Sequence, residues 1–137
     1  MNRRILSALL VFLFLTSVTI PAVVATETEI VTNKVDLHGG LGILPIKEGE
    51  IVLSTYFDYD GQTRPIPHVV EQYAKWGLTQ NHEETLSETP LPENGVKVEL
   101  KSKGYFDLGV GKFGEVLYVL SNSCDVNGHT TTTSKKV

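Results

Sequence analysis

Apolar and polar residues alternate most clearly in the C-terminal half of the chain. Between residues 96 and 101, valine and leucine occupy the even positions, whereas lysine and glutamate occupy the odd ones. This period of two predicts a β-strand that buries one face and leaves the other in water. Residues 105–110 repeat the alternation, and the turn-forming sequence Ser-Lys-Gly at 102–104 separates the two segments.

Residues 116–120 are apolar on both faces, which predicts a strand inside a sheet. The sequence Gly-Val-Gly-Lys-Phe-Gly at 109–114 matches a loose phosphate-loop pattern, but no helix is predicted after it. We therefore interpret these glycines as a turn between two strands. Three strands joined by short glycine-containing turns predict an antiparallel meander over residues 96–121.

The clearest strand of the first half covers residues 50–59. One of its faces would carry Ile51, Leu53, Thr55, Phe57 and Tyr59. Asp60 and Gly61 then supply a turn signal. Residues 30–37 show the same period over a shorter length and predict a second strand.

Residues 67–76 fit a helix and a strand about equally well. As a helix, the segment would bury Val69, Val70, Tyr73 and Trp76 on one side. As a strand, it offers β-forming residues without a clean alternation. Pro65 and Pro67 exclude a central strand at its start, because proline cannot donate a hydrogen bond to a sheet ladder.

Two polar segments carry no hydrophobic period. Residues 78–95 contain two prolines and predict a long surface loop. Residues 122–137 are rich in serine, asparagine and threonine, which predicts a disordered tail. The pattern as a whole predicts a mainly β fold, a small antiparallel sandwich or barrel-like sheet over residues 26–121, with at most one short helix at 67–76.

The N-terminal segment, residues 1–25, has the organisation of a secretory signal peptide. Two arginines precede an apolar run, and the small residue Ala25 ends a pattern that a signal peptidase recognises. We expect cleavage after Ala25, which would leave a single extracellular domain. The alternative is an uncleaved anchor, although the apolar run reaches the ~20 residues of a membrane span only by continuing past Pro21.

Charge and composition limit the classes of molecule that the protein is expected to bind. The full chain carries a net charge of −4, and removal of the N-terminal arginines makes the remainder more acidic. Such a chain is not expected to bind nucleic acid or to insert into a membrane after cleavage. A single cysteine and the absence of a glycosylation sequon after Ala25 favour a secreted protein of bacterial origin.

Few residues are candidates for a catalytic, metal-binding or reactive site. Cys124 has no intramolecular partner, and its polar neighbours predict an exposed thiol that can form a disulfide-linked dimer or bond to a partner. Asp58 and Asp60 precede a glycine, but we interpret them as a hairpin turn and not as a calcium loop. The four histidines lack the spacing of a metal site. We expect no catalytic residue, no metal ligand and no cofactor.

Aromatic residues are the remaining candidates for binding. An exposed aromatic face for an extracellular protein or glycan would be formed by Tyr56, Tyr59, Trp76 and Tyr105. The residues assigned to the core are Phe57, Phe106, Phe113 and Tyr118. We therefore expect a non-enzymatic binding or surface-associated role. The alternatives are a secreted effector, such as a bacteriocin-like toxin, and a small extracellular hydrolase whose site has no recognisable motif.

Overall fold

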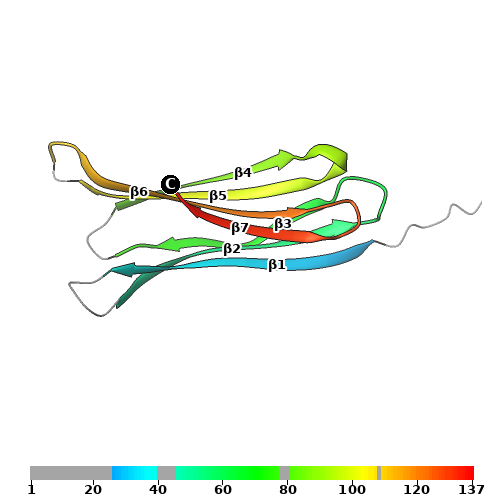
Figure 1. Ribbon diagram of the computed structural model, residues 1–137, viewed down its shortest axis with the longest axis horizontal. Helices are drawn as coiled ribbons and strands as arrows, with labels where there is room; N and C mark the ends of the chain where they lie inside the picture. The colour runs from blue at the N-terminus through cyan, green and yellow to red at the C-terminus, as the bar shows by residue number, and fades with distance from the viewer. Residues whose placement is uncertain (1–25, 40–45, 78–80, 108) are drawn as a thin grey trace, which may run out of the picture.

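Two antiparallel sheets pack face to face in the computed structural model of the chain (Figure 1). The structure describes residues 26–39, 46–77, 81–107 and 109–137. This architecture confirms the prediction of a mainly β fold and selects the sandwich. The segment 1–25, with its expected cleavage site at Ala25, lies outside the described residues. No helix in the described ranges is long and apolar enough to cross a membrane.

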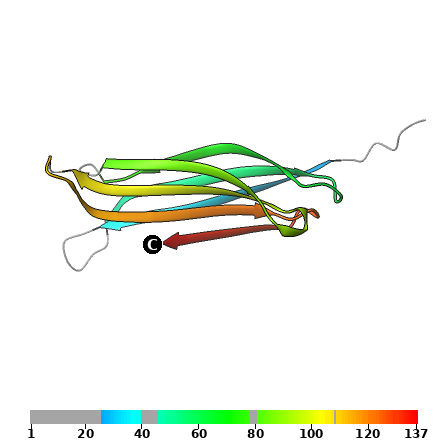
Figure 2. The same cartoon turned by 90° about the horizontal axis from the view of Figure 1, so that it is seen from above.

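Each sheet is a meander of consecutive strands. The three-stranded sheet contains β1 (Glu27–Gly39), β2 (Ile46–Tyr59) and β3 (Ile66–Lys75), in that order. The four-stranded sheet contains β4 (Asn81–Pro90), β5 (Val96–Asp107), β6 (Lys112–Cys124) and β7 (Thr130–Lys136). A 3-10 turn, η1 (Pro92–Asn94), precedes β5. The strands run along the long axis of an elongated molecule (Figures 1 and 2).

The alternation predicted for residues 96–101 is confirmed, whereas on β2 the predicted inner face is buried as far as Phe57 but Val52 and Ser54 of the opposite face are buried too. The side chains of Ile51, Leu53, Thr55 and Phe57 are buried on the inner face of β2. On β5, the even positions of this stretch are buried, and the odd positions between them are half-buried or exposed. The doubly apolar segment 116–120 lies in β6, which pairs with β5 and β7 on its two sides, as expected for an interior strand.

Residues 66–75 form strand β3, so the helix predicted as one option for 67–76 is wrong. The strand pairs with β2 along its length, from Ile66 opposite Asp58 to Lys75 opposite Glu50. Val70 forms a bulge in this ladder. Because this pairing satisfies the backbone with partners distant in sequence, the weak local pattern does not decide the structure. β3 is an edge strand, which agrees with the exclusion of a central strand by the prolines.

Two segments without a hydrophobic pattern are also strands, which corrects two predictions. The expected loop over 78–95 contains β4, and every residue of β4 is exposed. The expected disordered tail over 122–137 contains the end of β6 and the whole of β7. Both β4 and β7 are edge strands. They are held through backbone pairing to β5 and β6, for which no apolar period is needed.

The meander predicted over 96–121 has one turn fewer than expected. Residues 102–104 continue β5, and the chain turns instead before β6. Gly104 is buried beneath Trp76, and a Cβ atom there would overlap the indole ring. The glycine therefore permits a close approach and does not form a turn. Phe106 and Phe113 flank the observed turn and are exposed, so their assignment to the core is wrong.

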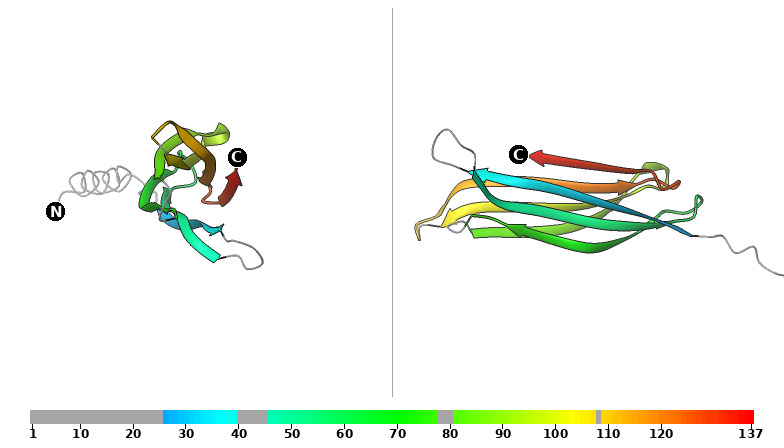
Figure 3. Two further views of the ribbon diagram at one scale, coloured as in Figure 1. Left: turned by 90° about the vertical axis from the view of Figure 1, so that its left-hand side faces the viewer. Right: turned by 90° about the horizontal axis from the view of Figure 1, so that it is seen from below.

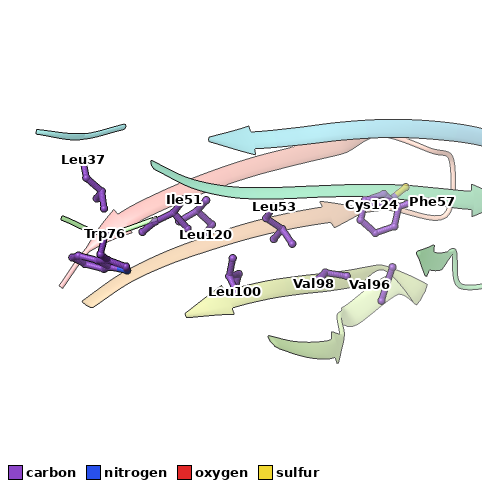
Figure 4. Packing of buried hydrophobic residues seen from close by; sticks show 10 residues of the cluster. All are labelled: Leu37, Ile51, Leu53, Phe57, Trp76, Val96, Val98, Leu100, Leu120 and Cys124. Carbon is purple, nitrogen blue, oxygen red and sulfur yellow. The ribbon is translucent and has the colours of Figure 1, made fainter. Parts of the chain in front are cut away.

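The core lies between the two sheets (Figure 4). It consists of Leu37, Ile51, Leu53, Phe57, Trp76, Val96, Val98, Leu100, Leu120 and Cys124. Buried asparagines connect the sheets on the β1 side. Asn33 Nδ2 donates to the carbonyl oxygen of Thr133 at 2.7 Å, and Asn122 Nδ2 donates to that of Leu53 at 3.0 Å. These hydrogen bonds hold β1 and β2 against β6 and β7.

Candidate functional site

The two long sides of the sandwich are closed to different degrees. On one side, β1 packs over β6 and β7, and Asn33 bonds across the sheets. On the other side, β3 packs mainly over β5 instead of β4. β3 and β4 lie along that side, opposite β7 (Figures 2 and 3). Within the described chain, neither β3 nor β4 has a strand on its outer edge. The inner face of β4 therefore lacks a covering strand.

This open side forms a groove between β3 and β4. The groove contains a depression of about 200 Å³, lined by Pro67, Val69, Leu86, Ser87, Glu88 and Val98. A second depression of about 100 Å³ is lined by Gln72, Tyr73, Ala74, Glu84 and Leu100. Both depressions reach β5, at residues two positions apart. We call this feature the β3–β4 groove.

Strand register explains why apolar side chains line the groove. On β4, Leu86 pairs with Leu100 and Glu88 with Val98, so these β4 residues share the face of buried β5 residues. On β3, Val69 pairs with the buried Thr55 and shares its face. Leu86 and Val69 nevertheless remain 41% and 38% exposed. They face the interior of the sandwich at a place where no strand of the described residues covers them.

The charge of the groove is negative. Glu84 and Glu88 lie on its β4 wall, and the inward positions of β3, β4 and β5 in this stretch carry no lysine or arginine. Glu84 accepts a hydrogen bond from Ser102 Oγ at 3.0 Å and contacts His82 Nδ1 at 2.8 Å. For Glu88, the described residues supply no ionic partner. The groove therefore combines apolar walls with a carboxylate that is not paired.

Both ends of the groove are bounded. Beyond β3, the buried Trp76 donates from Nε1 to Ser102 Oγ at 2.8 Å. Near the start of β3, Arg64 Nη2 donates to the carbonyl oxygen of Leu91 at 3.4 Å. The open length is that of residues 67–74, roughly 25 Å for an extended chain at about 3.3 Å per residue.

The predicted aromatic residues do not form one surface. Tyr56 stacks on His68 with ring centroids 4.4 Å apart, on the outer face of the three-stranded sheet. Tyr59 Oη donates to Glu27 at 2.7 Å. Trp76 is buried, and Tyr105 lies in the other sheet beneath the Lys112 ammonium. The tertiary structure therefore separates the four residues of the expected aromatic face.

The paired aspartates have separate structural partners. Asp58 accepts from Thr28 Oγ1 at 2.8 Å and contacts His68 at 3.1 Å. Asp60 accepts hydrogen bonds from the backbone N–H and the hydroxyl of Thr63 and from the N–H of Gln62, and these bonds lower its pKa. This arrangement is a carboxylate-capped turn, as interpreted from the sequence. Among the described residues, no three His, Cys, Asp or Glu side chains form a metal-binding group.

Cys124 is buried, which corrects the expectation of an exposed thiol. It belongs to the same core cluster as Phe57 (Figure 4). β6 continues to this residue, and Cys124 pairs with Thr130 on β7. Ser123 lies on the opposite face of the strand, and Asn122 shares the face of Cys124 but is itself buried, where it donates to the carbonyl oxygen of Leu53. Polar neighbours therefore do not indicate exposure. The structure removes the exposed thiol on which the expected intermolecular disulfide depended.

Burial of Cys124 predicts a specific pH dependence of stability. Burial, with smaller effects from Asp125 and Glu29, raises the pKa of the thiol to about 11 from an ordinary value of 9.0. Between these values, the unfolded chain releases the proton while the folded chain retains it. The free energy of unfolding should therefore fall by up to about 1.4 kcal/mol per pH unit as pH rises through this window.

Urea unfolding at pH 8, 9 and 10 measures this effect. Cys124→Ser provides the control, because titration of the other groups cancels in the difference between the two proteins. We expect the stability difference between parent and variant to shrink as pH rises. An equal slope with pH in both proteins would contradict a buried, neutral thiol.

The sequence does contain a signal for the β3–β4 groove. Leu86 is the one large aliphatic residue between residues 81 and 90, and the prediction of a loop there gave it no role. Comparison of the chain with family models, with curated protein sequences and with solved structures finds no match.

Proposed function

We propose that the protein is an exported, non-enzymatic domain that binds a protein partner along β3 and the adjoining β3–β4 groove. One observation carries this proposal: the free edge strand β3 has four large apolar residues exposed. Ile66 and Val70 are 60% and 62% exposed, and Val69 and Tyr73 are exposed to a smaller extent. Apolar side chains gathered on an unpaired edge are typical of an interaction surface.

The residues of this surface favour a protein as the ligand over a glycan. Sugar recognition commonly uses aromatic rings grouped on one face, whereas Tyr56, Tyr59 and Trp76 lie apart from one another in this fold. β3 offers aliphatic side chains together with the hydrogen-bonding groups of an unpaired strand edge. These are the features by which sheets bind extended protein segments. Export is inferred from residues 1–25, whose pattern is that of a signal peptide.

Site-specific photo-crosslinking tests the proposed surface. A benzophenone amino acid is introduced in place of Val70 on β3 or, as a control, in place of the exposed Thr132 on β7. Each full-length variant is produced in the native host and irradiated, and the products are identified by mass spectrometry. We expect one defined protein adduct from position 70 and none from position 132. Absence of an adduct at 70, or the same adducts at both positions, would refute the proposal.

A further inference from the structure

We propose that the β3–β4 groove accepts an extended strand of the partner, which pairs with the free edge of β3. This strand would place an aliphatic and a basic side chain, two residues apart, in the groove. The inference rests on the proposed function and specifies the chemistry of the bound segment.

The first argument is the unequal number of strands in the two sheets. Among the described residues, a three-stranded sheet faces a four-stranded sheet, and β4 is the strand left without one opposite it. A strand added to the outer edge of β3 would lie over β4 and complete a sandwich of four strands on four. It would cover Val69 and Leu86, the inward-facing apolar residues that remain exposed. It would also satisfy the backbone groups of the β3 edge, which is the usual basis of strand addition.

The spacing of the two depressions supports an extended ligand. Their floors are Val98 and Leu100, which lie two positions apart on one strand. Side chains at alternate positions of a bound strand repeat about every 6.6 Å and point to the same face. A strand aligned with β5 can therefore place residues i and i+2 in successive depressions.

The residues that line the groove indicate which side chains of the bound strand would fit its two depressions. Pro67, Val69 and Leu86 make the larger depression apolar, so it fits a bulky aliphatic group. Glu88 borders this depression, and Glu84 lines the other. The two carboxylates favour a basic residue at the neighbouring inward position.

The same charge argues against a second copy of this chain as the occupant. A twofold dimer through β3 would bring the two β4 edges together. Each edge carries Glu84 and Glu88, and each chain has a net charge of −4. Like charges across such an interface are unfavourable. A basic extended peptide is therefore the complementary occupant.

A synthetic peptide tests the chemistry directly. The probe is fluorescein-labelled Thr-Leu-Thr-Lys-Thr-Leu-Thr-Lys, which places leucine and lysine two residues apart on one face. One control peptide carries glutamate in place of lysine, and another carries proline in place of the central threonines, which removes N–H donors. Fluorescence anisotropy with the purified full chain should show saturable binding of the first peptide and at least about tenfold weaker binding of both controls.

Three variants locate the binding on the protein. Leu86→Arg should abolish binding of the lysine peptide, because the longer side chain fills the groove and adds a positive charge beside the peptide lysine. Glu88→Lys should weaken the lysine peptide about tenfold and restore binding of the glutamate peptide. Glu29→Lys makes the same charge change on β1, at the closed side of the sandwich, and should change neither affinity. Circular dichroism melting verifies that each variant is folded.

The outcomes separate this inference from the proposed function. Preference for the lysine peptide that is reversed by Glu88→Lys supports strand addition in the groove. If crosslinking at position 70 retains its partner while Leu86→Arg and the peptides have no effect, the partner binds β3 differently and this inference is wrong. A concentration-dependent dimer that Leu86→Arg disrupts would also overturn it, by making a second copy the occupant.

Discussion

Val98→Asp is expected to unfold the domain or to prevent its recovery. Val98 is buried on the inner face of β5, where it packs in the core. An aspartate there would be buried without a cationic partner, because the inward positions around it carry no lysine or arginine. Such a charge costs several kcal/mol, against a total stability of about 5–15 kcal/mol for a typical domain.

Lys97→Asp is the matched control for this substitution. Lys97 lies on the opposite face of β5 and pairs with Glu99 at 3.3 Å. Loss of a partly exposed ion pair should cost about 1 kcal/mol or less. Urea unfolding followed by the fluorescence of the single tryptophan measures both variants. Equal destabilisation by the two substitutions would mean that the register of β5 is wrong.

Trp76→Ala is expected to destabilise the protein by about 3–5 kcal/mol, the range for removing a large buried aromatic side chain. The indole lies over Gly104 and contacts Tyr118, with ring centroids 5.8 Å apart. Its removal would leave a cavity at the end of the sandwich. Ser102 Oγ would also lose the hydrogen bond that it accepts from the indole.

Trp76→Phe separates these two contributions. Phenylalanine keeps an aromatic ring over Gly104 and removes the Nε1 donor, so the cost should be about 1–2 kcal/mol. Ser102 Oγ can still donate to Glu84 in this variant. Because both substitutions remove the fluorophore, unfolding in urea is followed by circular dichroism. A cost below about 1 kcal/mol for Trp76→Ala would contradict the packing of this side chain in the core.

Sequence reasoning succeeded where one face of a strand is buried. The alternation along β2 and β5 predicted which side chains enter the core, and Phe57 and Val98 are both buried. The apolar segment of β6 predicted an interior strand, and β6 lies between β5 and β7. Pro67 predicted that its segment could not be central, and β3 is at the edge of its sheet. Each of these conclusions follows from side-chain chemistry that the sequence displays directly.

The same reasoning failed at Cys124 and at the candidate binding residues. The polar neighbours of Cys124 suggested exposure, but alternate residues of a strand face opposite sides, and this cysteine faces the core. Tyr56 and Trp76 were grouped by residue type, although the fold stacks one on a histidine and buries the other. Proximity between residues far apart in the chain depends on strand order and register, which composition does not specify.

The sequence by itself determined the β class, the core positions supplied by β2 and β5, and the exclusion of β3 from the centre of a sheet. Only the tertiary structure decided that 66–75 is a strand, that β4 and β7 exist, and that β3 and β4 border a groove. The physical reason is that burial must be encoded in the alternation of side chains. Edge strands instead depend on backbone hydrogen bonds, which nearly every residue can form once a neighbouring strand is in place.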